Sequence, residues 1–158
     1  MNEAIIIRPV QPEDHRAIFE ITAREFPAVA SIDARIERMI GGVPWSRIKN
    51  ARVREELDAC PEACAVAVRN DVIVGYITCI IDRTAERGTI ANLAVSRDCQ
   101  GRGIGRRLLE WALALFKNMG LQQAKIETLE CNDTGKHLYP RLGFREVVRQ
   151  IHYVMPLK

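Results

Sequence analysis

The sequence predicts one α/β domain with a mixed, mostly antiparallel central sheet, one parallel strand pair and flanking helices. Two β-rich runs within residues 64–82 are separated by Asn70-Asp71, a dipeptide typical of a tight hairpin turn. A third β-rich run, residues 88–96, leads into an apolar helical segment, and residues 124–131 form a fourth run after it. A strand–helix–strand crossover should place its two strands parallel. The 158 residues are enough for one domain with one core.

The elements before the hairpin are predicted from hydrophobic spacing. Residues 4–10 form a first strand that Pro9 ends, and residues 11–26 form a helix that begins near an acidic residue, Glu13 or Asp14. Between Pro27 and Pro61 the pattern is helical but is interrupted at 41–45, "GGVPW". The apolar residues expected to face the core in these helices are Ile18, Ile21 and Phe26, then Ile32, Ile36, Met39 and Ile40, and, more weakly, Ile48, Val53 and Leu57.

The C-terminal half continues the alternation of helix and strand. A broad apolar face predicts a helix over 106–118, stopped by Gly120. Residues 124–131 are expected to form a strand and residues 133–139 a short helix. Residues 145–157 are expected to form a final strand pair or one long bent strand.

Composition argues against several classes of function. The net charge of +3, from 23 basic and 20 acidic residues, is too small to indicate a nucleic-acid partner. The five cysteines are dispersed and share no ligand spacing with the three histidines, so we expect no metal and interpret the cysteines as small buried residues of a reducing cytoplasm. The longest apolar stretch, residues 72–81, is too short for a membrane helix, and the acidic N-terminal end is unlike a signal peptide.

The segment "QGRGIGRR" (100–107) has the composition of a phosphate-binding loop. It follows a predicted strand and opens a helix, where free main-chain N–H groups and the positive end of the helix dipole favour an anion. Four arginines surround it against one acid, Asp98: Arg97, Arg102, Arg106 and Arg107. The glycine frame does not fit GxGxxG, and no Gly-Lys-Ser/Thr occurs, so the two common nucleotide loops are set aside. A plain strand–helix turn with solvated arginines is the alternative.

The same loop resembles the Q/R-x-x-G-x-G/A signature of the GNAT superfamily of acyl-CoA-dependent N-acyltransferases. Gln100, Gly103 and Gly105 stand at its fixed positions, and "NLAV" (92–95) is similar to the strand before the family's loop. Downstream, "CNDTGKHLYPRLGF" (131–144) resembles the family's N-x-x-A-x-x-L-Y-x-x-x-G-F segment. The resemblance covers nearly the whole chain apart from residues 27–61. Because the two motifs occur in consistent order and at consistent distance, the chain is identified as similar to this family.

The resemblance implies acetyl-CoA as co-substrate, with its pyrophosphate on the loop residues Gln100, Gly101, Arg102, Gly103, Ile104, Gly105 and Arg106. In this family the strand before the loop bulges and splays away from the strand after the helix. Main-chain groups near Leu93, Ala94 and Val95 would then pair with the pantetheine arm, and Asn132 would help to hold it. The ribose phosphate would meet Arg97, Arg102 or Arg107, between which the sequence does not choose.

Amide formation from a thioester needs a neutral amine, a donor for the carbonyl oxygen and a proton for the leaving thiolate. The Val95 main-chain N–H, placed at the bulge, is the expected oxyanion donor. The family motif points to Tyr139 as the general acid, since a phenol keeps its proton at neutral pH. Pro140 departs from the motif and would push Tyr139 out of helical geometry. Gly135 replaces the usual alanine and should loosen the short helix.

The base and the acceptor are less defined. Glu127, Glu130 and Glu86 are candidate bases, and Asn92 is a candidate for ordering a water. Alternation along the strand would separate Glu127 from Glu130 on opposite faces. The helical region 27–61 is the expected acceptor site, with Trp45 as a candidate cap, but its charges are of both signs and select no substrate.

The expected activity is acetyl transfer from acetyl-CoA to a primary amine of a small molecule, peptide or protein. The alternatives are a non-catalytic acetyl-CoA-binding module and a nucleic-acid-associated protein that uses the arginines. A homodimer is left open because edge strands near the C-terminus commonly pair in this superfamily.

Overall fold

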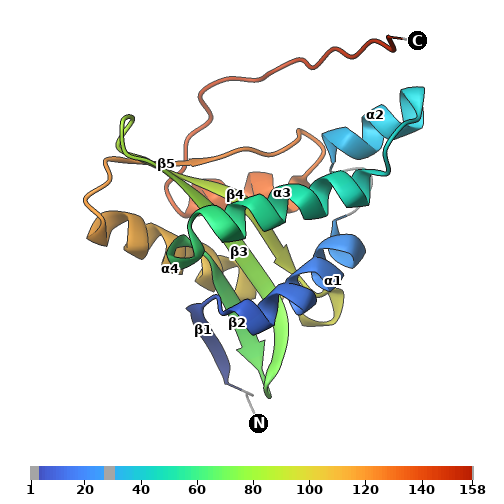
Figure 1. Ribbon diagram of the computed structural model, residues 1–158. Coiled ribbons are helices and arrows are strands. Elements are labelled where there is room, and N and C mark those ends of the chain that lie inside the picture. The colour runs from blue at the N-terminus through green and yellow to red at the C-terminus, as the bar shows by residue number, and fades with distance from the viewer. Residues whose placement is uncertain (1–3, 27–30, 158) are drawn as a thin grey trace.

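One five-stranded sheet carries the fold, and helices cover both of its faces (Figure 1). The computed structural model describes residues 4–26 and 31–157. The strands are β1 (Ile5–Pro9), β2 (Ala65–Arg69), β3 (Val72–Asp82), β4 (Arg87–Val95) and β5 (Gln123–Ile126), hydrogen-bonded in that order. The pairs from β1 to β4 are antiparallel, and β4 pairs with β5 in parallel. The predicted fold class is therefore confirmed.

Two helices pack on each face of the sheet, and a fifth extends one of the layers. α1 (His15–Glu25) and α3 (Trp45–Ala59) lie on one face, with α2 (Ile32–Ile40) packed against α3 (Figure 1). α4 (Ile104–Asn118) and α5 (Asp133–Arg141) lie on the opposite face. Short 3₁₀ turns precede α1, β2 and α4, at Pro12–Asp14, Pro61–Ala63 and Arg97–Cys99.

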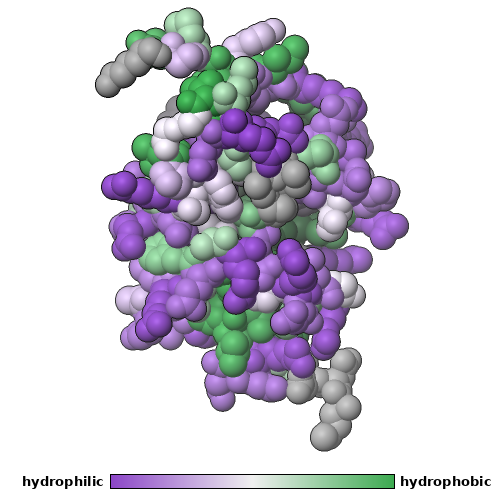
Figure 2. Space-filling model, turned by 90° about the vertical axis from the view of Figure 1, so that its right-hand side faces the viewer, coloured by the Kyte–Doolittle hydropathy of each residue, from purple (hydrophilic) through white to green (hydrophobic). Residues whose placement is uncertain are grey.

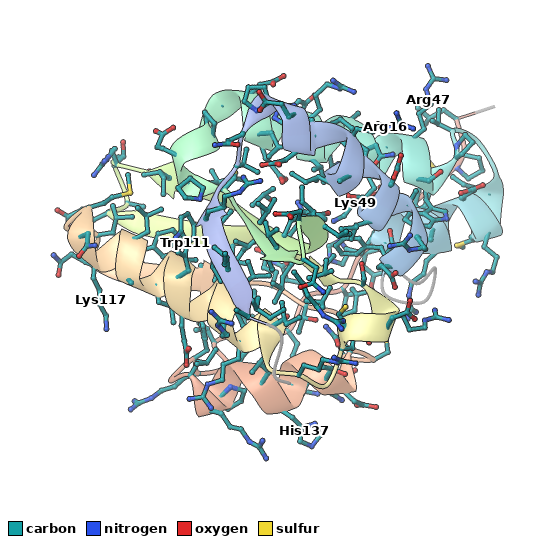
Figure 3. The ribbon with its side chains drawn as sticks, turned by 90° about the horizontal axis from the view of Figure 1, so that it is seen from below. Arg16, Arg47, Lys49, Trp111, Lys117 and His137 are labelled. Carbon is teal, nitrogen blue, oxygen red and sulfur yellow. The ribbon has the colours of Figure 1, made fainter. Side chains whose placement is uncertain are left out.

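Alternation along the strands divides the core between the two faces. On the α1/α3 face Tyr76 and Val66 pack with buried residues of the helices, which are Ile18, Ile21, Val53 and Leu57. On the other face Ile77 and Ile90 pack under α4, whose buried residues include Leu108, Leu109, Ala112 and Phe116. Trp111 joins this second cluster as a partly buried side chain, and Figure 3 shows it on α4 beside β1.

The turn between β2 and β3 matches the expectation from Asn70-Asp71. Both residues have positive φ, +48° and +60°, as a two-residue hairpin turn with right-handed strand twist requires. Asparagine and aspartate tolerate this left-handed region better than other side chains do. The turn therefore sets the pairing of β2 with β3 beside it, where Arg69 is opposite Val72.

A bulge in β4 opens the sheet. Thr78 of β3 faces Asn92, but the next residue, Cys79, faces Ile90, so Ala91 is the extra residue. The pairing of β4 with β5 ends at the same level, with Ile90 opposite Ile126. Beyond this point the two strands have no ladder between them, which leaves the C-terminal third of β4 with an open edge.

The bulge also explains why one predicted strand is too long. We expected a strand over 124–131, but β5 ends at Ile126, and residues 127–129 have no regular structure. A strand needs a partner ladder, and β4 has turned away at Ala91. The predicted alternation of Glu127 and Glu130 across a strand is therefore wrong.

The expected final strand over 145–157 is absent: this segment has no regular structure, and Figure 1 shows it leading away from the domain. Its apolar residues are exposed: Val147, Val148, Ile151, Tyr153, Val154, Met155 and Leu157. No strand of the described sheet forms a ladder with this segment. An ion pair between Arg149 and Glu130 (2.6 Å) connects the segment to the chain after β5.

The predicted helices of residues 27–61 are present, although residues 27–30 lie outside the described part of the chain. The break at "GGVPW" is confirmed, because α2 ends at Ile40 and α3 begins at Trp45. The expected apolar stripe of α2 does not form a core face, however. Ala34 is the buried residue, whereas Met39 is 73% exposed and Ile40 38%. The short helix packs onto α3, and the residues at its C-terminal end are exposed. Figure 2 shows this side of the molecule, where hydrophobic residues lie at the surface among hydrophilic ones.

Within residues 4–26 and 31–157, no helix is long and apolar enough to cross a membrane, and no cluster of metal-ligating side chains is found. The five cysteines, all within the described residues, form no disulfide. Cys64, Cys79 and Cys99 are buried as expected, but Cys60 is half-buried and Cys131 is exposed, so the interpretation of all five as buried residues is wrong.

Candidate acyl-transfer site

The glycine loop ends in an uncapped helix terminus. Gly101 and Gly103 have φ of +74° and +77°, and Gly103 is the N-cap of α4. No side chain caps this terminus, so the N–H groups of Ile104, Gly105 and Arg106 have no intrahelical partner. Together with the positive end of the helix dipole, these groups form a site suited to an anion.

The loop lies against the open edge of β4. A Cβ at Gly105 would be 3.9 Å from Cγ2 of Val95 and 4.0 Å from Cδ2 of Leu93, so the first turn of α4 touches both side chains. The Gln100 side chain donates from Nε2 to the main-chain carbonyl of Val95 over 2.9 Å. The sequence-predicted loop and strand residues are thus brought together.

The main-chain N–H groups of β4 that do not bond to β3 point to this opening. The Ser96 N–H donates to the Val74 carbonyl (2.8 Å), so it points toward β3. Because successive N–H groups of a strand point to opposite sides, those of Val95 and Leu93 point away from β3, to the side that β5 has left. The bulge itself is at Ala91, four residues before Val95, so the expectation that Val95 lies at the bulge is wrong.

The arginines of the segment differ in what they contact. Arg107 donates to the Ile5 carbonyl (2.8 Å), which connects α4 to β1, and Arg106 pairs with Glu110 (2.7 Å). Arg97 and Arg102 make no hydrogen bond or ion pair with any described residue. These two side chains are therefore the ones left for an anionic ligand.

On the α4 face, Asn132 and Tyr139 approach the chain after β5. The Asn132 side chain caps α5, accepting from the Gly135 N–H (3.1 Å), and donates to Oγ1 of Thr128 (2.8 Å). Burial raises the pKa of the Tyr139 phenol, and its hydrogen bond with Thr128 opposes this shift only in part. The net increase keeps Tyr139 protonated at neutral pH, as a general acid requires.

Pro140 does not displace Tyr139. α5 runs without a break from Asp133 to Arg141, because Pro140 lies in the last turn and costs only one intrahelical bond. Gly135 has a more specific consequence than a loosened helix. A Cβ there would lie 2.8 Å from Cε2 of Tyr139 and 2.8 Å from Nδ2 of Asn132, so glycine leaves room for the phenol ring.

The acidic residues singled out from the sequence lie at the surface. Glu127 is paired with Lys125, Glu130 with Arg149, and Glu86 is exposed in the turn before β4. His137 is exposed and projects away from α5 (Figure 3). None of these three carboxylates is held by the sheet near the bulge.

A carboxylate that sequence reasoning missed lies beside the bulge. Glu56 of α3 accepts hydrogen bonds at Oε2 from Thr78 (2.6 Å) and from Nδ2 of Asn92. Burial raises the pKa of Glu56, and the bonds from Thr78 and Asn92 and the charge of Lys49 offset part of this shift. Its helical phase was the available signal, since it lies three residues after buried Val53 and one before buried Leu57.

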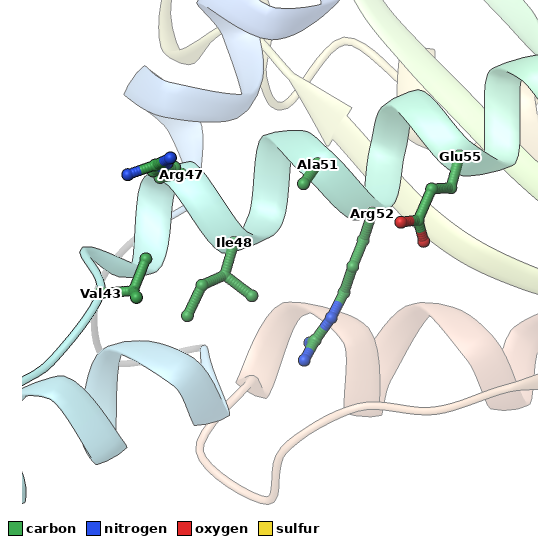
Figure 4. Close-up of a pocket in the computed structure, with 6 residues that line it drawn as sticks. All are labelled: Val43, Arg47, Ile48, Ala51, Arg52 and Glu55. Carbon is green, nitrogen blue, oxygen red and sulfur yellow. The ribbon is translucent and has the colours of Figure 1, made fainter.

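A shallow groove of about 470 Å³ runs along the outer side of α3, where Figure 4 shows it facing α2 and α5. It is lined by Val43, Arg47, Ile48, Ala51, Arg52 and Glu55. Arg52 is held by Asp33 of α2 (2.6 Å), and Arg35 of α2 reaches Sγ of Cys131 (3.2 Å), so α2 bridges α3 and the chain before α5. Trp45, the predicted cap, is half-buried at the start of α3 and does not line the groove.

A family model described as acetyltransferase (GNAT) family matches residues 15–144. The chain belongs to this family. The resemblance drawn from the loop and the Tyr139 segment is thereby confirmed, and the mixed sheet with its parallel pair of β4 and β5 matches the GNAT fold.

Similar proteins include N-terminal acetyltransferases. The chain is 36% identical over 98 residues to N-alpha-acetyltransferase 30 of Schizosaccharomyces pombe. This matched region covers 60% of this chain and 65% of that protein. It is 30% identical over 124 residues to the [ribosomal protein bS18]-alanine N-acetyltransferase of Haemophilus influenzae, covering 77% and 79%. The chain thus spans just under two thirds of the length of the fission yeast relative.

Solved structures share the fold at low identity. PaiA N-acetyltransferase from Thermoplasma acidophilum, in complex with coenzyme A, has a TM-score of 0.74 at 20% identity and 90% coverage of each chain. A chain of the NatC complex bound to Gag peptide and CoA has a TM-score of 0.72 at 24% identity, covering 96% of this chain and 91% of that one.

Proposed function

We propose that this GNAT protein transfers the acetyl group of acetyl-CoA to a primary amine by direct attack of the amine on the thioester. The observation that carries the proposal is the opening of the sheet at Ala91, with the uncapped start of α4 at one end and Tyr139 packed in the same cluster as Leu93 and Val95. The names of the relatives support acetyl transfer to an amine.

In this proposal the CoA pyrophosphate occupies the N–H groups at the start of α4, and the pantetheine arm pairs with the outward main-chain groups of Leu93 and Val95. The Val95 N–H, four residues beyond the bulge, donates to the developing oxyanion. Arg97 and Arg102 are the candidates for the ribose phosphate, since Arg107 is engaged with β1. Asn132 caps α5 and donates a hydrogen bond to Thr128. Because Thr128 in turn bonds to Tyr139, Asn132 helps to position the phenol.

Tyr139 supplies the proton for the leaving sulfur. Its raised pKa keeps the phenol protonated, and it lies on an α5 that Pro140 does not interrupt. The C–N bond forms as the C–S bond breaks, the electron pair leaves on sulfur, and the phenol proton moves to it.

We propose the N-terminal α-amine of a peptide or protein as the acceptor class, since the relatives are named for that chemistry. The groove along α3 is open to solvent, so a peptide end could reach it. The region of residues 31–61 would form the acceptor wall.

The test is thiol release from acetyl-CoA across a panel of peptides with free N-termini, their N-acetylated counterparts, free amino acids and polyamines. The proposal predicts release with the free peptides and none with the blocked ones. Binding of acetyl-CoA without thiol release for any amine would contradict it.

A further inference from the structure

A second shallow hollow, of about 450 Å³, lies on the side of α3 that faces α1, and we call it the α1/α3 hollow. The acetyl-transfer step as proposed uses no residue that is particular to this hollow. Its lining consists of one residue of α1 and five of α3, which are Ala23, Ser46, Arg47, Asn50, Ala51 and Arg54.

The α1/α3 hollow is positively charged. Arg47 and Arg54 line it, and no acidic side chain of the described residues does. Glu20, the acid of α1 one turn before the hollow, pairs with Arg16 instead (3.0 Å). Within residues 4–26 and 31–157, neither Arg47 nor Arg54 forms an ion pair. Two unpaired guanidinium groups in one hollow favour an anionic ligand.

The spacing of the two arginines limits the shape of this ligand. Arg47 and Arg54 are seven residues apart on α3, so their main-chain positions are about 10.5 Å apart along the helix axis. The guanidinium carbon of Arg54 lies 4.5 Å from the ring centroid of Phe19 on α1, a cation–π contact that restrains the side chain. An extended peptide advances about 3.3 Å per residue, so carboxylates two to four residues apart would have a similar separation.

The other lining residues favour a peptide over a nucleic acid. Asn50 lines the hollow, and its Oδ1 has no hydrogen-bond partner among the described residues. A carboxamide offers donors and an acceptor, which complement a peptide group, whereas a phosphodiester has no donor to offer. Among the described residues no aromatic side chain lines the hollow for base stacking, since Arg54 covers Phe19. Ala23 and Ala51 leave room for a main chain.

The α1/α3 hollow adjoins the groove in which we place the N-terminal end of the acceptor. Arg47 and Ala51 line both, so the two form one continuous surface across α3. A polypeptide that has its N-terminus in the groove and continues over the small side chain of Ala51 reaches the hollow. The occupant that fits is therefore a later part of the acceptor chain itself.

We infer that the α1/α3 hollow is a specificity subsite that binds an acidic segment of the acceptor polypeptide, downstream of the amine that is acetylated. Arg47 and Arg54 pair with its carboxylates, and Ser46 and Asn50 bond to its main chain. This inference rests on the proposed acetyl transfer, and it specifies the substrate class as polypeptides with acidic residues after the N-terminus. Because the two arginines are exposed, the subsite adds selectivity that salt screens.

The test measures kcat/KM for acetyl transfer to peptides that share one N-terminal sequence. A downstream pair of residues is glutamate, glutamine or lysine, and the pair is placed at several distances from the N-terminus. Arg54→Glu is the test variant, since Arg54 lines the hollow but not the groove. Lys117→Glu is the matched control: it changes the net charge equally, and Figure 3 shows Lys117 projecting from α4, on the other face of the sheet. Thermal melts are recorded for all three proteins.

We expect the wild type to favour the glutamate peptide over the lysine peptide by roughly three- to tenfold at the best distance, with a preference that shrinks in added salt. Arg54→Glu should reduce this preference to about one or reverse it, and Lys117→Glu should keep it. No preference in the wild type at any distance would overturn the inference and leave the proposed function intact. A preference that Arg54→Glu leaves unchanged would also overturn it, because the acidic segment would then bind elsewhere.

A binding measurement separates the subsite from the chemistry. Fluorescence anisotropy follows N-acetylated, and hence unreactive, glutamate and lysine peptides on the wild type and on Arg54→Glu. Weaker binding of the glutamate peptide to the variant would support the subsite. Absence of acetyl transfer by the wild type would overturn the proposed function, and the hollow would then stand as an acidic-peptide site on this binding alone. A single-stranded oligonucleotide that binds more tightly than the glutamate peptide, and loses this binding in Arg54→Glu, would overturn the inference.

Discussion

The side-chain amide of Gln100 donates to the main-chain carbonyl of Val95 over 2.9 Å and so connects the glycine loop to the open edge of β4. In the proposed function, this connection holds the anion site at the start of α4 at a fixed distance from the proposed thioester site on β4. Its loss should loosen both at once.

Gln100→Ala should therefore weaken CoA binding by about two- to tenfold, the effect of one neutral hydrogen bond. Calorimetric titration with CoA measures it. Gln122→Ala, an exposed glutamine after α4, is the control and should leave the affinity unchanged. Equal affinities for all three proteins would show that the Gln100 contact has no part in ligand binding.

Gly103→Asp should abolish most CoA binding, because it places a carboxylate beside the N–H groups expected to hold the pyrophosphate. The positive φ of +77° strains any side chain there, so Gly103→Asn is the matched control with nearly the same shape and no charge. We expect an affinity loss of at least about tenfold for Asp relative to Asn, and the gap should shrink with added salt. If the two variants bind CoA equally, the pyrophosphate does not occupy the start of α4.

Tyr139→Phe should lower kcat by roughly a hundredfold with little change in the affinity for acetyl-CoA, since it removes the proton donor and keeps the ring. Stopped-flow thiol release and equilibrium binding separate the two quantities. Tyr153→Phe, which alters a tyrosine that is 91% exposed on the C-terminal segment, is the control. Unchanged kcat in Tyr139→Phe would remove this residue as the acid.

Gly88→Ala should destabilise the fold by about 1–3 kcal/mol, because its Cβ would lie 2.5 Å from the ring of buried Phe116 on α4. Denaturant unfolding measures the change. In the Gly88→Ala/Phe116→Leu double variant the smaller side chain makes room for the methyl group, so the total loss should be less than the sum of the single losses. Additive losses would mean that the two residues do not compete for the same space.

The sequence predicted the elements whose signals are local. The Asn70-Asp71 turn, the break before Trp45 and the helix after the glycine loop are each specified by neighbouring residues, and all three were found. The lengths of strands depend on partners elsewhere in the chain. β5 ends at Ile126 because β4 bulges at Ala91. The amino acids at 127–131 contain no signal that predicts this end.

The candidate site divides in the same way. Gln100, Gly103 and Tyr139 belong to linear motifs and could be named from the sequence. Glu56 could not, because its importance comes from contacts with Thr78 and Asn92 on two other elements. In the sequence, Glu56 differs from its neighbour Glu55 only in its position on the helix relative to Val53 and Leu57.

The most direct test of the account follows the acetyl group itself. The protein is incubated with isotopically labelled acetyl-CoA and a peptide that has a free N-terminus and one internal lysine, and tandem mass spectrometry locates the label. The account predicts label on the α-amine of the peptide, together with one equivalent of free CoA thiol. Bound acetyl-CoA with no label on any amine would contradict acetyl transfer and leave a non-catalytic acetyl-CoA-binding protein.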